Sequence, residues 1–433
     1  MKKMAIEKIN KRSTVVGVVG LGYVGLPLAV EKAKTGFKTI GFDVQAERVE
    51  MVNRGENYIG DVVGADLEEL VEAGMLSATT DYSFIADVNF IAICVPTPLD
   101  VYQQPNISYV KSSGEQISKY LKKGTMVVLE STTYPGTTEE LLKPILEQGS
   151  GLVCGVDFYL GFSPERVDPG NLKFRTKNTP RVVGAIGADA LEVISYMYRT
   201  VLDGNVVEVS SPTVAEMSKL LENTYRNVNI ALVNELAMLC DKMGINIWEV
   251  IDAAATKPYG FQAFYPGPGP GGHCIPLDPF YLSWKAREYG FHTSLIEASA
   301  MINDRMPEYV SERAARLLNK HKKPLNGSKI LILGVAYKQD ISDYRESRAI
   351  DVIKHLEESG SLVDYHDPFV SRFFHAGVAK ESVDCNVEDY DLVIITTAHT
   401  KVDYESIALA GVPILDTKNA MKSVTQRCNF ELL

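Results

Sequence analysis

The chain has few cysteines for its length, and neither they nor the histidines are spaced to bind a metal. Its 433 residues include six cysteines, at positions 94, 154, 240, 274, 385 and 428, with no Cys-x-x-Cys pair. The seven histidines contain no His-x-x-x-His spacing. This pattern argues against a disulfide framework and against a zinc site. His273 stands beside Cys274, but no partner ligand lies near it in the sequence, so we expect no metal.

Basic runs and membrane-spanning segments are also missing. The net charge is −11, and no cluster of lysines or arginines offsets it, which argues against nucleic acid or an anionic membrane as a partner. Residues 13–30 carry no charge and follow several lysines, which superficially resembles a signal peptide. Glycines and Pro27 interrupt this run, and a glycine motif explains it better. We therefore expect a soluble, cytoplasmic protein.

That glycine motif is a dinucleotide-binding fingerprint in its full context. A β-branched run leads into Gly20-x-Gly22-x-x-Gly25, an apolar helical stretch follows, and a second predicted strand ends in Asp43. Such glycines form a tight turn and let a pyrophosphate approach the N-terminus of the helix. A carboxylate at Asp43 would accept hydrogen bonds from the ribose hydroxyls and repel a 2′-phosphate. We predict NAD rather than NADP as the cofactor.

A second motif places one cysteine between a glycine-rich turn and a helical pattern. Residues 266–274 read Pro-Gly-Pro-Gly-Pro-Gly-Gly-His-Cys. Glycine lets backbone approach a ligand closely, and the partial positive charge of a helix N-terminus favours a thiolate. A thiolate attacks carbonyl carbons. Cys274 is therefore a candidate nucleophile, and a buried structural cysteine is the alternative.

The order of apolar runs divides the chain into three parts, since 433 residues are too many for one core. Residues 1–210 alternate helical patterns with apolar runs at 15–19, 38–42, 89–95, 126–130, 153–160 and 181–184. Residues 211–323 are helical and include one long helix over Val214–Met243. Residues 324–433 restart the alternation without the full fingerprint. The predicted fold class is α/β, with two Rossmann-like doubly wound units joined by a central all-helical domain.

Together these motifs resemble the UDP-glucose/GDP-mannose dehydrogenase family over essentially the whole chain. The Cys274 loop is the most specific part of the resemblance. With Lys177–Pro180, the stretch Pro266–Glu288 is most similar to the UDP-N-acetylglucosamine 6-dehydrogenases of the family. The resemblance implies oxidation of the sugar C6 alcohol to a carboxylate, with two NAD consumed and no aldehyde released. The product would feed surface-polysaccharide assembly.

The resemblance also implies catalytic roles. Lys219 and Asn223, four residues apart on the long helix, would hydrogen-bond the oxyanion that develops at C6. Cys274 would form a thiohemiacetal and then a thioester. Glu165 would act as the acid–base group, while Asp278 and Thr132 would position water. Without the resemblance, Lys219 reads as a solvated charge, and either carboxylate reads as a loop residue or a helix cap.

The implied binding residues form two sets. Those expected to contact NAD are Gly20, Gly22, Tyr23, Val24, Gly25, Asp43, Arg48, Pro96, Thr97, Thr132 and Arg345. Those expected to contact the UDP-sugar are Glu165, Arg166, Lys219, Asn223, Tyr259, Gly271, Gly272 and Lys338. We also expect a homodimer or higher homo-oligomer, formed through the long central helix.

One departure from the family pattern bears on the substrate. UDP-glucose enzymes carry an arginine in the loop before the cysteine, and Lys257–Phe261 contains none. This favours a bulkier C2 group, with UDP-N-acetylglucosamine the best choice and UDP-N-acetylmannosamine, UDP-N-acetylgalactosamine or UDP-glucose as alternatives. Aromatic residues of this loop could pack on an acetamido methyl group, and Gln262 could hydrogen-bond its amide. Subunit packing is the loop's other plausible role.

Two other functions are compatible with parts of this sequence pattern. A two-electron hydroxyacid dehydrogenase on a similar scaffold needs no cysteine nucleophile, so the Cys274 loop argues against it. An NAD-binding regulatory module needs no catalytic set, and Lys219, Asn223, Glu165 and Cys274 are all intact. Both rivals are therefore less favoured than the dehydrogenase.

Overall fold

A computed structural model describes residues 1–60, 62–166, 171, 173–272, 274–375, 377–425 and 429–433. Residues 273 and 428, and part of the segment after Glu165, therefore lie outside the described residues. The chain divides into two compact units. One contains Met1–Glu222 and Phe280–Phe291, and the other contains Asn223–Pro279 and His292–Leu433. The long helix α8, Pro212–Met243, contributes residues to both units.

The first unit is built on an eight-stranded sheet with the order β3-β2-β1-β4-β5-β6-β7-β8. Its strands are β1 Val16–Val19, β2 Thr39–Phe42, β3 Leu76–Thr79, β4 Phe90–Ile93, β5 Met126–Leu129, β6 Tyr159–Phe162, β7 Arg181–Ala185 and β8 Val206–Val209. Neighbouring strands are parallel except β6 and β7. The chain direction across the sheet reverses between β1 and β4, where doubly wound folds bind ligands.

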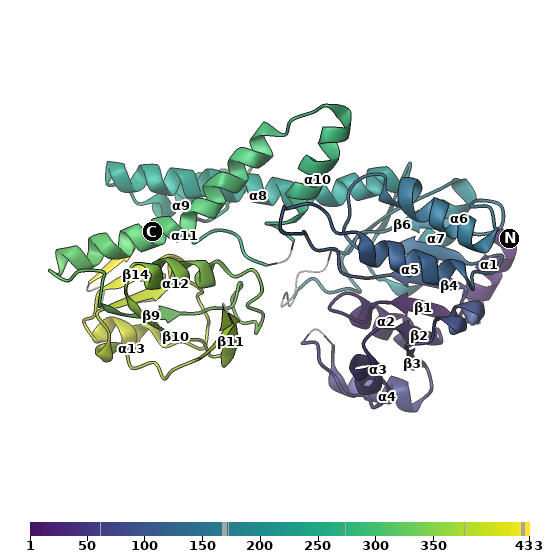
Figure 1. Ribbon diagram of the computed structural model, residues 1–433, viewed down its shortest axis with the longest axis horizontal. Coiled ribbons are helices and arrows are strands. Elements are labelled where there is room, and N and C mark those ends of the chain that lie inside the picture. Colours follow the sequence, from purple (N-terminus) through teal and green to yellow (C-terminus); the bar gives the residue numbers. More distant parts are fainter. Residues whose placement is uncertain (61, 167–170, 172, 273, 376, 426–428) are drawn as a thin grey trace. The chain divides into compact units, whose positions relative to one another are not determined.

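Helices cover both faces of this sheet because its strands are buried on both sides. One face packs against α1 Lys2–Asn10, α2 Gly25–Lys34, α3 Ala46–Asn53, α4 Gly64–Glu72 and α7 Ala188–Val201. The other packs against α5 Ser108–Ser118 and the continuous stretch formed by the π-helix η2 Thr137–Leu142 and α6 Lys143–Ser150 (Figure 1). A short 3₁₀ helix, η1 Tyr82–Asp87, precedes β4.

The second unit contains a parallel sheet of five strands in the order β10-β9-β13-β14-β15. They are β9 Lys329–Leu333, β10 Leu362–His366, β13 Leu392–Ile395, β14 Ile414–Asp416 and β15 Phe430–Leu432. The strands β11 Arg372–His375 and β12 Val378–Glu381 form a separate two-stranded antiparallel hairpin. The predicted α/β fold with two Rossmann-like sheets is confirmed.

The helices of the second unit complete its core and carry the cysteine loop. On one face of the sheet lie α11 Ser294–Lys320 and α12 Arg348–Glu358 (Figure 1). On the other lie α13 Tyr404–Leu409 and the 3₁₀ helices η4 Val387–Asp389 and η5 Ala420–Ser423. Helix α9, Ile247–Ala255, packs against α8. Helix α10, Asp278–Ala286, begins just after Cys274. From Phe280 on, this helix and the 3₁₀ helix η3 Arg287–Tyr289 that follows it belong to the first unit.

Several elements differ from those expected from the apolar runs. The run at 153–160 was expected to be a strand, but β6 begins only at Tyr159, after a turn bridged by Cys154 and Phe158. Strands β3, β8 and β15 and the hairpin were not anticipated. β3 alternates buried and exposed residues because it lies at the sheet edge, so it lacks the continuous apolar run of a central strand. Among the described residues, no helix combines the length and apolar character needed to cross a bilayer.

Candidate active site

The glycine turn after β1 has the shape required to receive a phosphate. Gly20 has φ +91°, and a Cβ there would lie 2.6 Å from the Cys94 carbonyl oxygen. A Cβ on Gly25 would lie 1.8 Å from the Gly20 oxygen, so both positions require glycine. At Gly22, by contrast, a Cβ would meet nothing within 4 Å. That open space lies beside the N-terminus of α2, where the N-cap residue Val24 offers no side-chain acceptor, so this turn fits a pyrophosphate.

Asp43 holds this turn in addition to the role predicted for it. Its Oδ2 accepts a hydrogen bond from the Leu21 N–H at 2.8 Å, and its Oδ1 accepts one from Gln45 N–H at 2.9 Å. Arg48 lies 3.7 Å from Oδ2. A carboxylate has about four acceptor positions, so two N–H donors still leave capacity for ribose hydroxyls. Asp43 therefore connects the shape of the turn to the place where the ribose is expected.

The turns after β4 and β5 lie together at the carboxyl edge of the same sheet. Ser131, next to Thr132, donates its hydroxyl to the Val95 oxygen at 2.8 Å, just before Pro96. The oxygen of Thr97 accepts a hydrogen bond from the Tyr281 hydroxyl at 2.5 Å. The predicted residues Pro96, Thr97 and Thr132 are thus brought together. Tyr281, which is fully buried, anchors this turn, and no sequence motif indicates it.

Glu165 lies just after β6 and is held on both carboxylate oxygens. Oε1 accepts the Arg166 N–H at 2.8 Å, and Oε2 accepts Arg181 Nη1 at 2.9 Å. The backbone oxygen of Glu165 accepts a hydrogen bond from Lys219 Nζ at 2.7 Å. The structure therefore brings together two of the predicted catalytic residues, Glu165 and Lys219, within the first unit.

Arg166, predicted to bind substrate, makes a two-point ion pair with Glu222 of α8. Its Nη2 and Nε lie 2.7 Å and 3.3 Å from the Glu222 carboxylate oxygens, and its Nη1 donates to the Pro180 oxygen at 3.0 Å. These contacts attach the Glu165 segment to the long helix. Neither Glu222 nor Arg181 was singled out from the sequence, since each lies far along the chain from the residue that it holds.

In the second unit, Asn223, Asp278 and Cys274 are close neighbours. Asn223 Nδ2 donates to Asp278 Oδ2 at 2.5 Å, and both side chains are buried. The backbone oxygen of Cys274 accepts the Asp278 N–H at 2.9 Å, in the turn that leads into α10. The Cys274 residue itself is exposed. An exposed cysteine thus lies one turn before the carboxylate of a buried amide–carboxylate pair.

A set of buried asparagines holds both ends of the cysteine loop. Asn227 Nδ2 donates to the Ile275 oxygen at 3.1 Å, and Asn234 Oδ1 accepts the Gly267 N–H at 3.0 Å. Asn303 of α11 contacts both of them, at 3.0 Å to Asn234 and 3.2 Å to the Asn227 oxygen. Because residues 223, 227 and 234 have helical spacing on α8, the amide face was visible in the sequence, but its partners were not.

The glycines before Cys274 are required by packing within the second unit. A Cβ on Gly271 would lie 2.9 Å from the Tyr337 side chain, and one on Gly272, with φ +82°, would lie 2.8 Å from the same ring. Tyr337 directly precedes Lys338, so the cysteine loop packs against the segment that carries the predicted substrate lysine. Arg345 of that segment pairs with Asp343, with its Nη2 2.6 Å from Oδ2.

The loop predicted to choose the sugar also packs on α8. Tyr259 is 72% exposed, and the Lys257 ammonium lies 5.0 Å from the centre of its ring. Gln262 Oε1 accepts a hydrogen bond from the Tyr225 hydroxyl at 3.1 Å, and Phe264 stands edge-on to the Tyr225 ring at 5.8 Å. Tyr259 is therefore open to an incoming ligand.

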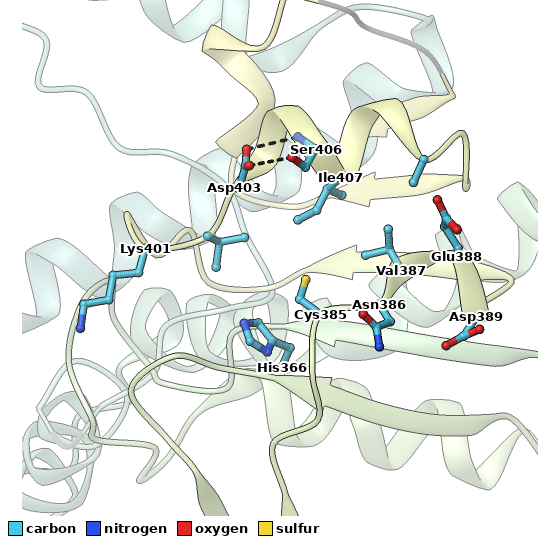
Figure 2. A pocket seen from close by; sticks show the side chains of 12 residues that line it. His366, Cys385, Asn386, Val387, Glu388, Asp389, Lys401, Asp403, Ser406 and Ile407 are labelled. Atoms are coloured by element: carbon cyan, nitrogen blue, oxygen red, sulfur yellow. Dashed lines mark hydrogen bonds between the residues drawn. The ribbon is translucent and has the colours of Figure 1, made fainter.

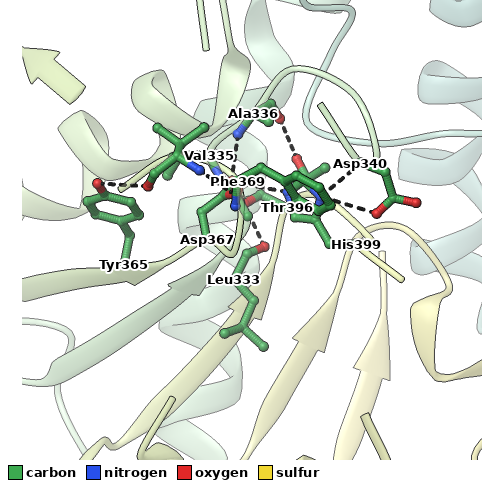
Figure 3. A network of polar contacts seen from close by, with 12 residues as sticks. Leu333, Val335, Ala336, Asp340, Tyr365, Asp367, Phe369, Thr396 and His399 are labelled. Atoms are coloured by element: carbon green, nitrogen blue, oxygen red, sulfur yellow. Dashed lines mark hydrogen bonds and ion pairs between the residues drawn. The ribbon is translucent and has the colours of Figure 1, made fainter. Parts of the chain in front are cut away.

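The turn after β9 is held by a buried carboxylate, as Figure 3 shows. Asp367 accepts hydrogen bonds from Val335 and Ala336 N–H at 2.7 Å and 3.0 Å, and from His399 Nε2 at 3.1 Å. His399 Nδ1 accepts the Asp340 N–H at 3.0 Å, which assigns the ring proton to Nε2. Burial opposes ionisation, but the donors, led by His399, hold the pKa of Asp367 below its usual value. This network orders the start of the segment that carries Lys338.

A cavity of about 670 Å³ lies elsewhere in the second unit (Figure 2). His366, Cys385, Val387, Lys401, Asp403 and Ile407 are among the residues that line it. No predicted site residue is among its described lining. Nor do the described residues include a group of three or more histidines, cysteines or carboxylates arranged to hold a metal ion.

The fold and the glycine turn define an NAD-binding α/β protein with a second Rossmann-like unit. Models of the UDP-glucose/GDP-mannose dehydrogenase family match residues 14–202 as its NAD binding domain, 213–305 as its central domain and 331–423 as its UDP binding domain. The chain therefore belongs to this family, as its motifs predicted. It is an NAD-dependent UDP-sugar dehydrogenase.

Individual relatives agree on the class but differ in substrate. The chain is 38% identical to a UDP-N-acetyl-D-glucosamine 6-dehydrogenase of Pseudomonas aeruginosa, over 89% of this chain and 90% of that protein. It is 35% identical to a UDP-N-acetyl-D-mannosamine dehydrogenase of Pyrococcus horikoshii, over 94% and 96% of the two chains. A solved structure of a UDP-D-ManNAc dehydrogenase from Pyrococcus horikoshii superposes with a TM-score of 0.88 at 33% identity, covering 97% and 99% of the two chains.

Proposed function

We propose that this enzyme oxidises the C6 alcohol of a UDP-N-acetylhexosamine to the carboxylate, with UDP-N-acetylglucosamine as its best substrate. The observation that carries the proposal is that the exposed Cys274 lies in the turn that ends at Asp278, whose buried carboxylate accepts a hydrogen bond from Asn223. The loop without arginine and the relative that acts on UDP-N-acetyl-D-glucosamine support this sugar over UDP-glucose. UDP-N-acetylmannosamine is the second candidate because several relatives are named UDP-N-acetyl-D-mannosamine dehydrogenase.

The first oxidation produces an aldehyde at C6. NAD, when bound, supplies the hydride acceptor for both oxidations. Lys219 and Asn223 lie four residues apart on α8, and each offers an N–H donor for the oxygen that becomes negative as C6 changes. The contact of Lys219 with the Glu165 oxygen supports this role, since it keeps the ammonium beside the acid–base residue.

The second oxidation passes through Cys274. Its thiolate adds to the aldehyde carbon, which forms a C–S bond and gives a thiohemiacetal. Loss of a second hydride from C6, and of the hydroxyl proton to solvent, converts this adduct into a thioester. Water then attacks the thioester carbon, Glu165 takes the proton, the C–S bond breaks, and the thiolate leaves. Asp278 and Thr132 position the water, and the alcohol has then lost four electrons.

We propose that two copies of the chain associate through α8. Large apolar side chains are exposed along this helix at spacings of three, four or seven residues: Val214, Met217, Leu221, Tyr225, Leu232, Leu236, Leu239 and Met243. Such a stripe is typical of a helix that packs against another one. We also propose the division into domains 1–210, 211–323 and 324–433, supported by the limits of the three family matches.

A panel of UDP-sugars tests the proposed function. NADH release and carboxylate formation are measured for UDP-N-acetylglucosamine, UDP-N-acetylmannosamine, UDP-N-acetylgalactosamine and UDP-glucose. The proposal expects two NADH for each sugar, with UDP-N-acetylglucosamine the fastest. One NADH for each sugar, with free aldehyde accumulating, would contradict the cysteine mechanism.

A further inference from the structure

A chain of buried ion pairs stands behind Glu165 in the first unit. Arg181 at the start of β7 lies between two carboxylates, Glu165 after β6 and Glu130 after β5. The side chain of Glu130 is 0% exposed, that of Arg181 is 4% exposed, and that of Glu165 is 13% exposed. Only Glu165, at the end of the chain of contacts, therefore reaches toward solvent.

Arg181 uses three nitrogens on three different partners. Nη1 donates to Glu165 Oε2 at 2.9 Å, Nε donates to the Ser163 hydroxyl at 3.0 Å, and Nη2 pairs with Glu130 Oε2. The second oxygen of Glu130 accepts the Tyr198 hydroxyl at 2.5 Å. Because guanidinium is planar, contacts at three nitrogens fix both its position and its plane. The direction of the N–H that meets Glu165 is thereby fixed as well.

Lys32, Cys94 and two aromatic rings also face the cluster around Arg181. Lys32 of α2 lies over the Phe90 and Tyr198 rings, with Nζ at 4.3 Å and 4.8 Å from their centres. Burial lowers the pKa of Lys32 to about 8, and burial raises the pKa of Glu130. Cys94, which also faces the cluster, stays a thiol because burial raises its pKa.

The cluster thus contains two basic side chains, Arg181 and Lys32, and two carboxyl side chains, Glu130 and Glu165. Buried ion pairs seldom repay their desolvation, so an apolar core would serve stability as well. One guanidinium that binds both the buried carboxylate of Glu130 and the reactive carboxylate of Glu165 does, however, fix the orientation of the reactive one. We propose that Arg181 is a positioning residue, held by Glu130 and Tyr198, that aims the Glu165 carboxylate at the water which hydrolyses the Cys274 thioester. This inference rests on the function proposed above.

The main test replaces Arg181 by lysine, which keeps the charge but loses the planar fork. Arg181→Lys should slow thioester hydrolysis by about ten- to a hundred-fold while KM for the UDP-sugar changes little, since the Arg181 side chain is buried behind Glu165. A covalent sugar adduct on Cys274 should then accumulate, and intact-protein mass spectrometry detects it. The matched control is Arg199→Lys on α7, an exposed arginine paired with Glu208.

A second variant tests how the charge is shared. Glu130→Gln leaves Arg181 to Glu165 alone, so Glu165 should lose its proton more readily. The acid limb of the kcat–pH profile should move to lower pH, by about one unit. A purely structural role would lower the amount of folded enzyme without moving this limb.

The outcomes separate this inference from the proposed function. If Glu165→Gln hydrolyses the thioester as fast as wild type, the role proposed for Glu165 is wrong. Suppose instead that Glu165→Gln hydrolyses the thioester slowly, while Arg181→Lys forms no adduct and Glu130→Gln keeps the acid limb of the wild-type kcat–pH profile. The role proposed for Glu165 then stands, and only the positioning role of Arg181 is overturned. Should Arg181→Lys not fold, the pH limb of Glu130→Gln decides the matter by itself.

Discussion

The Lys219 ammonium donates a hydrogen bond to the backbone oxygen of Glu165 at 2.7 Å. The family resemblance assigns these residues to different steps, the first to the oxyanion at C6 and the second to proton transfer. Since Lys219 holds the backbone of Glu165 while Arg181 holds its carboxylate, the proposed acid–base residue is fixed from two sides. A substitution at Lys219 should therefore disturb both steps. Its effect on the rate should exceed the effect expected from lost oxyanion stabilisation alone.

Removal of the Cys274 thiol should abolish carboxylate formation. Cys274→Ala has no group to form the thiohemiacetal, whereas Cys274→Ser should form an ester that hydrolyses slowly, because alkoxide is the poorer leaving group. The measurement is the ratio of NADH to carboxylate product. Cys385→Ala, at a half-buried thiol of the second unit, is the control and should keep the wild-type ratio. Full activity in Cys274→Ala would show that this cysteine is not the nucleophile and has only a structural role.

Asp43 should set the preference for NAD. Wild type should favour NAD over NADP by at least ten-fold, which corresponds to about 1.4 kcal/mol. Asp43→Ala should narrow the gap mainly by losing NAD affinity, and it should also loosen the glycine turn, since Leu21 and Gln45 N–H lose their acceptor. Asp43→Asn keeps an acceptor oxygen without the charge and so separates the two effects. An unchanged preference in both variants would assign ribose recognition to another residue.

The loop before the cysteine should discriminate between sugars. A site built for an acetamido group loses a hydrogen bond and methyl burial with UDP-glucose, and each loss costs roughly 1 kcal/mol or more, so kcat/KM should differ by about ten- to a thousand-fold. Gln262→Ala should reduce this difference. Tyr225→Phe is its partner control, because it removes the hydroxyl that holds Gln262 without changing the amide. Equal rates for the two sugars in wild type would reject the substrate proposal but leave the C6 chemistry intact.

Acid should weaken the second unit through Asp367. A carboxyl whose folded-state pKa is depressed contributes stability above its usual pKa, and that contribution disappears as the pH falls through the folded-state value. Asp367→Asn should therefore lower the free energy of unfolding at pH 7 by roughly 2 kcal/mol or more, and the deficit should shrink below about pH 4. Urea unfolding at several pH values measures this. The control is Asp364→Asn, an exposed residue on β10, for which little change is expected.

Charge placed on the exposed stripe of α8 should separate the subunits. Leu236→Glu with Leu239→Glu puts two carboxylates where large apolar side chains are now exposed, so the sedimentation coefficient should fall to that of a single chain. Val101→Glu, at a side chain that is 91% exposed on a loop of the first unit, is the control. A wild-type protein that already sediments as one chain would disprove the oligomer.

Local sequence by itself determined several secondary-structure elements and the two glycine-rich motifs of this protein. The glycine turn, the strands on either side of it and the helix over 212–243 were predictable because each depends on residues close together in the chain. The Cys274 loop was equally visible. The expected strand at 153–160 was wrong because a turn over these residues delays β6, and apolar composition alone does not distinguish the two.

Only the tertiary structure decided which side chains hold the reactive ones. Arg181 meets Glu130 across 51 positions, and Arg166 meets Glu222 across 56. The order of β5, β6 and β7 in the sheet brings Arg181 near Glu130, and the position of α8 brings Glu222 to Arg166. The order of these residues in the chain shows neither contact. Burial then makes these contacts matter, because a charge removed from water needs a partner and the fold determines which partner is within reach.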